Sequence, residues 1–348
     1  MPIPTEAIGS IPRPAALIEG MTQGAADLEA RFDHAVADTI ARLEQLGAPV
    51  ISDGEQRKPS FATYPVQGAP NLGPGGVVIP FADGHTRQLP ALTAGPFRYR
   101  TYAVEYLERA KKYAHRPMKQ AVIAASALSL LYPQAGLADY PREEFLADLV
   151  NEAELDIRRC LAAGADSVQL DFTEGRLAVK LDPSKGLLNA FVDLNNRVLE
   201  RFTAEERRKI GVHTCPGGDR DSTHSADVDY AELLPSLFRL QVGRFYVQLA
   251  SEADPARVLE ILKRYTQPDR IIFVGVIDPI NPTVESAELV RDRILAAAKV
   301  IDPSLLGSTD DCGFAPFGDD TSTSRETAFA KIRARVEGNA LASAALGV

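Results

Sequence analysis

The sequence predicts an α/β protein built as a single (β/α)8 barrel, a closed cylinder of parallel strands surrounded by helices. Short apolar runs alternate with longer segments of helical period, which is typical of βα units around a parallel sheet. Most of the apolar runs end in polar residues, as barrel strands do at the face that carries active sites. No Gly-rich dinucleotide-binding motif follows the first run, so an open, doubly wound sheet is the less favoured alternative.

Eight candidate strands follow one another along the chain. They span residues 7–12, 49–55, 119–125, 166–172, 209–215, 244–250, 270–278 and 305–313. The segments between them have the helical period that a barrel requires. We therefore expect residues 1–348 to form one catalytic barrel domain.

The helix expected over residues 143–164 is defined by an apolar stripe at spacings of three or four residues. The stripe consists of Phe145, Leu149, Ala153, Ile157 and Cys160 with Leu161. Gly164 stands where a glycine commonly ends a helix. On such a stripe Cys160 is interpreted as a small core residue.

Two further helices are predicted from their start signals. Asp254 followed by Pro255 predicts a helix over residues 254–265, because Asp caps a helix and Pro is favoured at the first helical position. The pair Asn281 and Pro282 predicts another helix over 281–301 in the same way.

Residues 57–117 depart from this alternation. Residues 68–84 are rich in Gly and Pro, and residues 95–113 have the pattern of a strand that leads into a helix. We expect an insertion with a hairpin-like segment near residues 65–105, lying over one end of the barrel.

Composition excludes several classes of function. With 47 acidic and 38 basic residues the net charge is −9, which provides no basic surface for nucleic acid or anionic lipid. No stretch of about 18 apolar residues occurs, and the N-terminus lacks the pattern of an export signal. Three widely spaced cysteines do not make a disulfide framework. We expect a cytoplasmic protein that acts on small molecules.

The polar residues at the strand ends are expected to converge, because all strands of a barrel end at the same face. They are Ser10, Asp53, Glu55, Asp171, Glu174, His213, Cys215, Gln248, Asp278, Asp310, Asp311 and Cys312.

A metal site is predicted within this set. His213 and Cys215 are two residues apart on one strand, so their side chains face the same side, and Cys312 ends the last strand. Thiolate and imidazole ligands around an open position are typical of catalytic zinc. The alternative is that an isolated His-x-Cys pair in a strand is incidental.

Other polar motifs have two interpretations each. Asp53 and Glu55, with Arg57 beyond them, suit an ammonium group or form a solvated ion-pair cluster, and Asp171 with Glu174 is a second carboxylate pair at a strand end. The backbone of Gly217 and Gly218 suits an anion or makes a tight turn. His224 follows in a loop that either approaches the metal site or is solvated.

In sequence order the motifs resemble those of one known family. These motifs are IGSIPR, DGEQR, QLDFTEGR, GVHTCPGGD, YVQLAS, GVIDPINP and DDCGF. They resemble the C-terminal catalytic barrel of cobalamin-independent methionine synthase and its single-barrel relatives, which include zinc-dependent thiol alkyltransferases. The resemblance covers residues 5 to about 335.

The resemblance implies a function and a set of ligands. It implies zinc bound by His213, Cys215 and Cys312, and transfer of a methyl or related alkyl group to the zinc-bound thiolate of a small thiol. The acceptor it implies is homocysteine, which becomes methionine. Ser10, Glu55 and Asp171 stand where the family holds the amino-acid part of homocysteine, and we group Glu174 with these substrate-binding residues.

The chain departs from the family pattern at two positions of the site. The family usually has glutamate as a fourth zinc ligand where this chain has Gln248, so Gln248, Glu252 or water is expected there. The family's histidine on the donor side is absent, and Asp278 and Asn281 are the residues available for a catalytic role. The expected donor is methyltetrahydrofolate or methylcobalamin, the latter delivered by a corrinoid protein.

Three alternatives stay open. A coenzyme-M-like thiol added to an epoxide would use the turn at Gly217 and Gly218 with Arg220 to bind its sulfonate. A metal-free lyase that resembles uroporphyrinogen decarboxylase would have arginines facing the cavity. An inactive barrel kept as a binding module would bind the metal without turnover.

Overall fold

Six parallel strands form the main sheet of the protein in the computed structural model, which describes residues 2–348. In spatial order they are β12 (Leu306–Asp310), β11 (Ile271–Ile277), β10 (Arg244–Val247), β7 (Ile210–Thr214), β6 (Ser167–Asp171) and β5 (Lys119–Ile123). Each lies within a strand predicted from the sequence. Because all six are parallel, their carboxyl ends lie at one face.

Two further backbone segments close this sheet into a ring of eight, which confirms the (β/α)8 barrel. Thr5 forms a parallel bridge with Ser308 of β12, and Ile51 forms one with Met118 before β5. The two segments are joined to each other where the Ile11 amide donates to the Gly54 carbonyl at 2.9 Å.

The prediction of regular strands over 7–12 and 49–55 is wrong, because local hydrogen bonds replace the ladder there. Ser52 Oγ donates to the Gly9 carbonyl at 3.0 Å and accepts from the Gly54 amide at 3.2 Å. Asp53 Oδ1 accepts from the Glu55 amide at 2.9 Å. Side chains that bond to nearby backbone in this way favour turns over strands.

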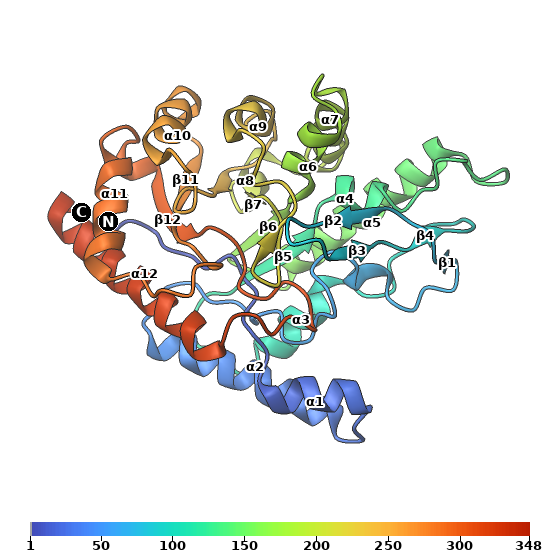
Figure 1. The fold of residues 1–348 in the computed structure, drawn as a ribbon, viewed down its shortest axis with the longest axis horizontal. Coiled ribbons are helices and arrows are strands. Elements are labelled where there is room, and N and C mark those ends of the chain that lie inside the picture. Colours follow the sequence, from blue (N-terminus) through green and yellow to red (C-terminus); the bar gives the residue numbers. More distant parts are fainter. Residues whose placement is uncertain (1) are drawn as a thin grey trace.

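Helices cover the outside of the ring, with α10, α9 and α7 along the top of the view in Figure 1 and α2 at the bottom. The longer helices are α1 (Ala15–Gln23), α2 (Leu28–Gln45), α3 (Ala103–Ala110), α5 (Arg142–Ala162), α6 (Glu174–Leu181), α7 (Gly186–Leu199), α9 (Tyr230–Leu237), α10 (Pro255–Leu262), α11 (Ala287–Ala298) and α12 (Arg325–Leu346). The short helices are α4 (Ala125–Ser129) and α8 (Ala204–Arg207), and 3-10 turns span Tyr64–Val66, Lys263–Tyr265 and Pro303–Leu305.

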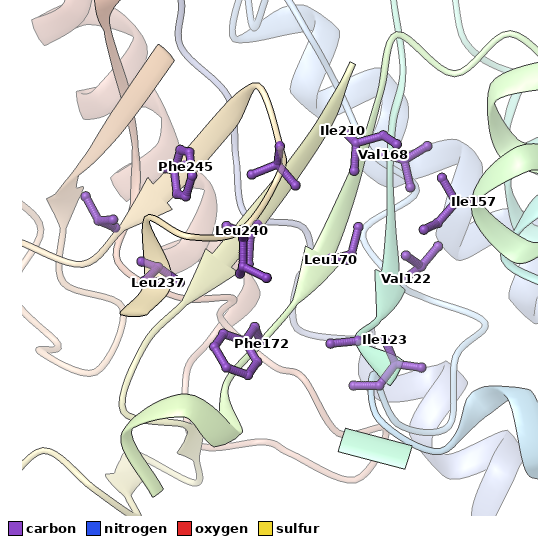
Figure 2. Close-up of a cluster of buried hydrophobic side chains, with 14 of the residues drawn as sticks. Val122, Ile123, Ile157, Val168, Leu170, Phe172, Ile210, Leu237, Leu240 and Phe245 are labelled. Atoms are coloured by element: carbon purple, nitrogen blue, oxygen red, sulfur yellow. The ribbon is translucent and has the colours of Figure 1, made fainter. Parts of the chain in front are cut away.

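The apolar core lies between the strands and this outer layer. Figure 2 shows part of it, in which Val122, Val168 and Ile210 of three neighbouring strands lie beside Ile157 of α5. The predicted stripe of α5 is confirmed, since all of its members except the half-buried Leu161 are buried. The helix ends as expected, with Gly164 at φ +81° just beyond it.

Of the two start signals, one is confirmed and one is wrong. Asp254 accepts from the Arg257 amide and caps α10, with Pro255 as its first residue. In contrast, α11 begins six residues later than expected, at Ala287, because Ser286 Oγ accepts from the Leu289 amide at 3.2 Å. Asn281 Oδ1 accepts from the Thr283 amide instead, so it closes a local turn.

The insertion contains two small antiparallel pairs and a helix. Strand β1 (Leu72–Gly73) pairs with β4 (Ala91–Leu92), and β2 (Val78–Pro80) pairs with β3 (Thr86–Gln88). The hairpin predicted from the sequence is therefore confirmed.

The strand expected at the start of residues 95–113 is absent, and only α3 forms within that range. The backbone donors there bond to side chains, because the Phe97 amide donates to the Tyr140 hydroxyl and the Tyr99 amide to Glu152 Oε2. Pro96 has no amide proton to offer a ladder.

The β2–β3 hairpin (residues 78–88) lies over the carboxyl ends of the barrel strands. Just after β2, the Ala82 amide donates to the Thr223 carbonyl at 2.9 Å. Thr223 belongs to a second, very short hairpin made of β8 (Gly218–Asp219) and β9 (Ser222–Thr223), which follows β7. The insertion therefore contacts the segment next to the predicted metal ligands.

At the amino end of the described chain, the Ile3 amide donates to Ser343 Oγ of α12 at 3.0 Å, so the two ends lie together (Figure 1). Within residues 2–348, no helix has both the length and the apolar character that crossing a membrane requires.

Replacing Ser286 with alanine is expected to lower the free energy of unfolding by about 1 kcal/mol, because the cap of α11 is lost. Asn281→Ala is the matched control and is expected to change it by less than about 0.5 kcal/mol. Urea unfolding followed by circular dichroism measures both. A larger loss for Asn281→Ala than for Ser286→Ala would contradict this start of α11.

Candidate metal centre and substrate cavity

The structure brings His213, Cys215 and Cys312 together. Their candidate ligand atoms all lie within 4.8 Å of one another, and the two sulfurs are 3.1 Å apart. His213 is on β7, Cys215 directly follows that strand, and Cys312 follows β12. Strands β10 and β11 lie between β7 and β12 in the sheet, so the convergence arises from the curvature of the barrel.

These three residues fit a metal ion by their chemistry. His213 is buried, and neither of its ring nitrogens has a hydrogen-bond partner among the described residues. A buried polar atom without a partner is costly, and a bound cation would satisfy it. Cys215 and Cys312 are free thiols, and one imidazole with two thiolates is a typical zinc donor set. The neighbouring Cys215 thiol and burial raise the pKa of Cys312 well above its usual value.

The turn after the first two ligands is tight. Gly217 has φ +70°, and a Cβ built on it would lie 1.7 Å from Nε2 of His224. The Gly217 amide lies 3.4 Å from the sulfur of Cys215 and donates to it. Only glycine fits at position 217, and its lack of a side chain lets the buried His224 pack against the ligand loop.

Ser10, Glu55 and Asp171 line one cavity together with His213 and Cys312. The resemblance implied that these three residues hold the amino-acid part of a thiol substrate, and that role stays a prediction. All three are buried. Burial and the Glu55 carboxylate raise the pKa of Asp171 to about 6. A substrate ammonium group between these two carboxylates would relieve that repulsion.

Hydrogen bonds from neighbouring side chains and from one backbone amide orient the three cavity residues. Lys58 Nζ donates to Glu55 Oε1 at 2.8 Å, and Gln169 Nε2 donates to Asp171 Oδ1 at 2.7 Å. The Ser10 hydroxyl accepts from the Ala315 amide at 3.2 Å, which leaves its own proton available to a ligand.

Glu174 does not share the cavity of Asp171. It lines a second cavity, with Thr173 between the two. Its Oε1 accepts from the Ser126 hydroxyl, whereas its Oε2 has no partner among the described residues. Burial raises the pKa of Glu174 to about 8. The carboxyl is therefore mostly protonated at neutral pH.

The fourth metal ligand stays a prediction. Gln248 Nε2 donates to Glu252 Oε1 at 2.7 Å, and Arg176 Nη1 donates to the same oxygen at 2.7 Å. Glu252 is thus held by an ion pair and lies outside the three-residue group. Gln248 lines a hollow beside Cys312.

The catalytic roles expected of Asp278 and Asn281 also stay predictions. Asp278 lines the hollow beside Cys312, and its Oδ1 accepts from the amides of Ile280 and Asn281 at 3.0 and 3.3 Å. Asn281 is exposed, and its side chain closes the turn described above.

Asp311 has a positioning role that the sequence did not reveal. Its carboxylate accepts from the amides of Leu249, Ala250 and Ser251 at 2.9, 3.0 and 2.7 Å, and so holds the loop that follows Gln248. A Cβ on Gly275 would lie 1.8 Å from Asp311 Oδ1, so this glycine leaves room for the carboxylate. Its place beside Cys312 was the only sequence signal.

Arg13 is a second residue that positions loops of the site and whose role the sequence did not reveal. Its guanidinium donates to the carbonyl oxygens of Glu55, Lys58, Ala315 and Phe317 at 2.7, 2.5, 3.3 and 3.1 Å. It thereby joins the loop that carries Glu55 to the segment after Cys312. The sequence contained Arg13 within IGSIPR, but a carbonyl-binding arginine has no local signature.

Two alternatives are disfavoured by the charges. Arg220, expected to bind a sulfonate, is paired with Asp319 at 3.0 Å, and Asp219 lies in the same turn. Among the described residues that line the three cavities near the ligands, Arg87 is the one arginine, and Asp219 and Asp319 hold it. The cluster of cavity arginines expected of the decarboxylase-like alternative is therefore absent there.

The chain is similar to known proteins over nearly its whole length. The family described as "Cobalamin-independent synthase, Catalytic domain" matches residues 3–337. A methionine synthase of Saccharolobus solfataricus is 24% identical over 345 residues, covering 97% of this chain and 93% of that protein. That of Sulfolobus acidocaldarius is 23% identical over 321 residues, covering 89% and 85%.

Solved structures show the same fold. A B12-independent methionine synthase from Shewanella sp. W3-18-1, in complex with selenomethionine, superposes with a TM-score of 0.79 at 20% identity over 99% of both chains. A putative vitamin-B12 independent methionine synthase from Listeria monocytogenes gives 0.69 at 22% identity over 97% of both chains.

Glu174→Gln is expected to make stability less sensitive to alkaline pH. The folded-state pKa of Glu174 lies above that of an unfolded glutamate, so the native state holds a proton that the unfolded state has lost. The free energy of unfolding contributed by this group therefore falls as pH rises from about 5 towards 8. The amide keeps the shape and does not titrate.

Urea unfolding of wild type and Glu174→Gln at about pH 6 and about pH 9 measures the effect. We expect the wild type to lose more stability between the two values than the variant does. Equal losses in both proteins would show that Glu174 is ionised in the native state at pH 6.

Proposed function

From the premise that the chain belongs to the cobalamin-independent synthase catalytic-domain family, a family of methyltransferases, we propose that it transfers a methyl group to the sulfur of homocysteine. The observation that carries the proposal is the single cavity lined by His213, Cys312, Ser10, Glu55 and Asp171. It combines thiol-binding chemistry with groups that recognise an amino acid.

We propose zinc as the metal, held by His213, Cys215 and Cys312 with Gln248 or water completing its shell. Bound zinc would keep the substrate thiol deprotonated at neutral pH while leaving its sulfur nucleophilic. Buried imidazole nitrogens without partners and two adjacent thiols support this choice of ligands.

The protein's own residues bind and orient the acceptor. Asp171 and Glu55 would pair with the ammonium group of homocysteine, and the Ser10 hydroxyl would donate to its carboxylate. Because all three are buried, little water competes for these charges, and the pairs are stronger than at a surface. Fixing the ammonium and carboxylate groups on the α-carbon would direct the sulfur towards the metal ligands and align it for in-line attack on the methyl carbon.

The donor expected from the sequence needs one correction. A corrinoid protein carrying methylcobalamin was one of two expected donors, and a cobalamin-independent family argues against it. The reaction breaks the bond between the methyl carbon and the donor heteroatom, which keeps the electron pair, and forms the carbon–sulfur bond of methionine.

The first test is the metal content of the purified protein. Wild type is expected to carry stoichiometric zinc, and Cys312→Ala is expected to lose most of it because one of three protein ligands is gone. Cys160→Ala is the matched control, since that cysteine is buried in α5 away from the ligands and should leave the zinc content unchanged. Elemental analysis by mass spectrometry measures all three proteins. A wild-type protein without zinc, or a Cys312→Ala protein with the full zinc content, would contradict the proposal.

The second test concerns the acceptor site. Asp171→Asn is expected to weaken homocysteine binding by roughly 10- to 100-fold, because a buried charge-assisted pair contributes about 1.5–3 kcal/mol. Asp139→Asn, on an exposed loop, is the control and should bind as wild type does. Calorimetric titration with homocysteine, on samples of equal zinc content, gives both dissociation constants. Unchanged binding in Asp171→Asn would remove this residue from the substrate site.

A further inference from the structure

Phe61 lies where two cavities meet. The acceptor cavity, which Ser10, Glu55 and Asp171 line, adjoins the second cavity, which Glu174 lines. Among residues 2–348, those that line both cavities are Phe61, Thr173, Gly217 and Gly218. Two of these four are glycines and a third is a threonine, so the ring of Phe61 is the one large side chain among them.

The space on the two sides of this boundary is unequal. The second cavity has a volume of about 260 Å³, and its walls include Leu128 of α4, Leu177 of α6 and Phe81 of the β2–β3 hairpin. The acceptor cavity is much narrower. Room for a larger ligand group therefore lies on the far side of Phe61 from the acceptor cavity.

The backbone of Phe61 is held in place by the segment that follows Cys312. The Phe61 amide donates to the Pro316 carbonyl at 3.0 Å, and the adjacent Ser60 forms an antiparallel bridge with Phe317. The guanidinium of Arg13 joins the same two segments. With these bonds in place, the backbone cannot easily carry the ring away from the boundary.

The ring of Phe61 is also held in place. It meets the ring of Phe317 edge to face, with the ring centres 5.6 Å apart and the planes at 80°. The guanidinium of Arg87 lies 4.2 Å from the centre of the Phe317 ring, and Asp219 and Asp319 hold Arg87. A ligand group that overlaps a side chain packed in this way must displace its neighbours as well, which is costly.

The candidate metal ligands lie at the same boundary. His213 and Cys312 line the acceptor cavity together with Phe61. A Cβ built on Gly218 would lie 3.8 Å from the sulfur of Cys312, so one of the shared residues contacts a candidate ligand. An acceptor sulfur bound at these ligands would therefore carry its substituent towards the boundary that Phe61 occupies.

We propose that Phe61 determines the size of the alkyl group on the acceptor sulfur, so that methyl is admitted and larger groups are excluded. The inference rests on the proposed function, because it takes the acceptor cavity to be the amino-acid site. The second carbon of an ethyl group would overlap the fixed ring. In a fitted apolar pocket one added methylene weakens binding by about tenfold or more.

Two product-like ligands that differ by one carbon test this role. L-Methionine carries a methyl group on its sulfur, and L-ethionine carries an ethyl group. Calorimetric titration of the zinc-loaded full chain with each gives two dissociation constants, and their ratio is the readout. We expect the wild type to bind ethionine at least about tenfold more weakly than methionine. A purely structural role of Phe61 would weaken both ligands alike in a variant and leave the ratio unchanged.

Variants at the boundary should change this ratio. Phe61→Ala removes the ring and is expected to bring the two dissociation constants within about threefold of each other, because the ethyl group gains room. Phe61→Leu should give an intermediate ratio, and it decides the matter if Phe61→Ala does not keep its zinc.

Two control variants should keep the wild-type ratio. Phe32→Ala removes a half-buried ring of α2 that also lies against an arginine, but Phe32 lines neither of the two cavities. Ala226→Leu narrows the hollow beside Cys312 that Gln248 lines. It tests whether the substituent points into that hollow instead.

Several results would overturn the inference. A wild type that binds both ligands equally would do so, as would a wild-type ratio in Phe61→Ala or, where that variant loses its zinc, in Phe61→Leu. A ratio changed by Ala226→Leu alone would place the substituent in the other hollow. These results leave the proposed function intact, provided that the wild type binds methionine and homocysteine. If the zinc-loaded wild type binds neither amino acid, the proposed function fails and this inference fails with it.

Discussion

The site depends on the closure of the barrel, because its sulfur ligands come from strands that are not neighbours. Cys215 follows β7 and Cys312 follows β12, with two strands between them in the sheet. They meet only if the sheet curves and the strand ends stay in register. The Thr5–Ser308 and Ile51–Met118 bridges and the bond between Ile11 and Gly54 complete that curve where regular strands are missing. The segments that complete it also carry Ser10 and Glu55.

Side chains that hold backbone atoms give these irregular segments their shape. Glu55 has φ +55°, a region that non-glycine residues avoid, and its carbonyl is held by Arg13. Asp311 does the same for the loop after β10, where three amides converge on one carboxylate. Strain and buried charge of this kind persist only when several bonds determine the position together. Arg13 and Asp311 thus hold the loops of the site in place, although neither needs to contact a substrate.

The sequence was sufficient for the features that rest on local periodicity. Six strands, the stripe of α5, the cap of α10 and the hairpin follow from patterns over a few residues, and the same strand ends indicated His213, Cys215 and Cys312. The start of α11 could not be predicted from such a local pattern. Asn281 and Ser286 are both good caps, and the choice between them depends on Glu285, which accepts from the Asp278 amide and from the buried Lys331.

Ion pairs between residues far apart in the chain could not be predicted either, because they too depend on contacts that no local pattern reveals. Arg87, Asp219 and Asp319 are far apart in the chain, and no local period links them. Asp171 and Glu174 were expected to act as one pair because they are close in sequence. The short turn into α6 instead directs them into different cavities. That separation places Asp171 in the cavity of the Glu55 carboxylate, and Glu174 in the cavity that Arg87 and Asp319 also line.

Two cavities with different charged residues adjoin next to the candidate metal ligands. In a low dielectric, the carboxylates of Glu55 and Asp171 attract a substrate cation strongly, whereas a charge placed without a counter-ion is rejected just as strongly. Under the proposed function an amino acid would bind in the first cavity, whereas in the second Arg87 is already paired with Asp219 and Asp319. Phe61, Thr173, Gly217 and Gly218 line both cavities, and the two glycines add no side chain to this boundary. His213 and Cys312 line the first cavity beside these shared residues, which is where the proposed function would place the acceptor sulfur.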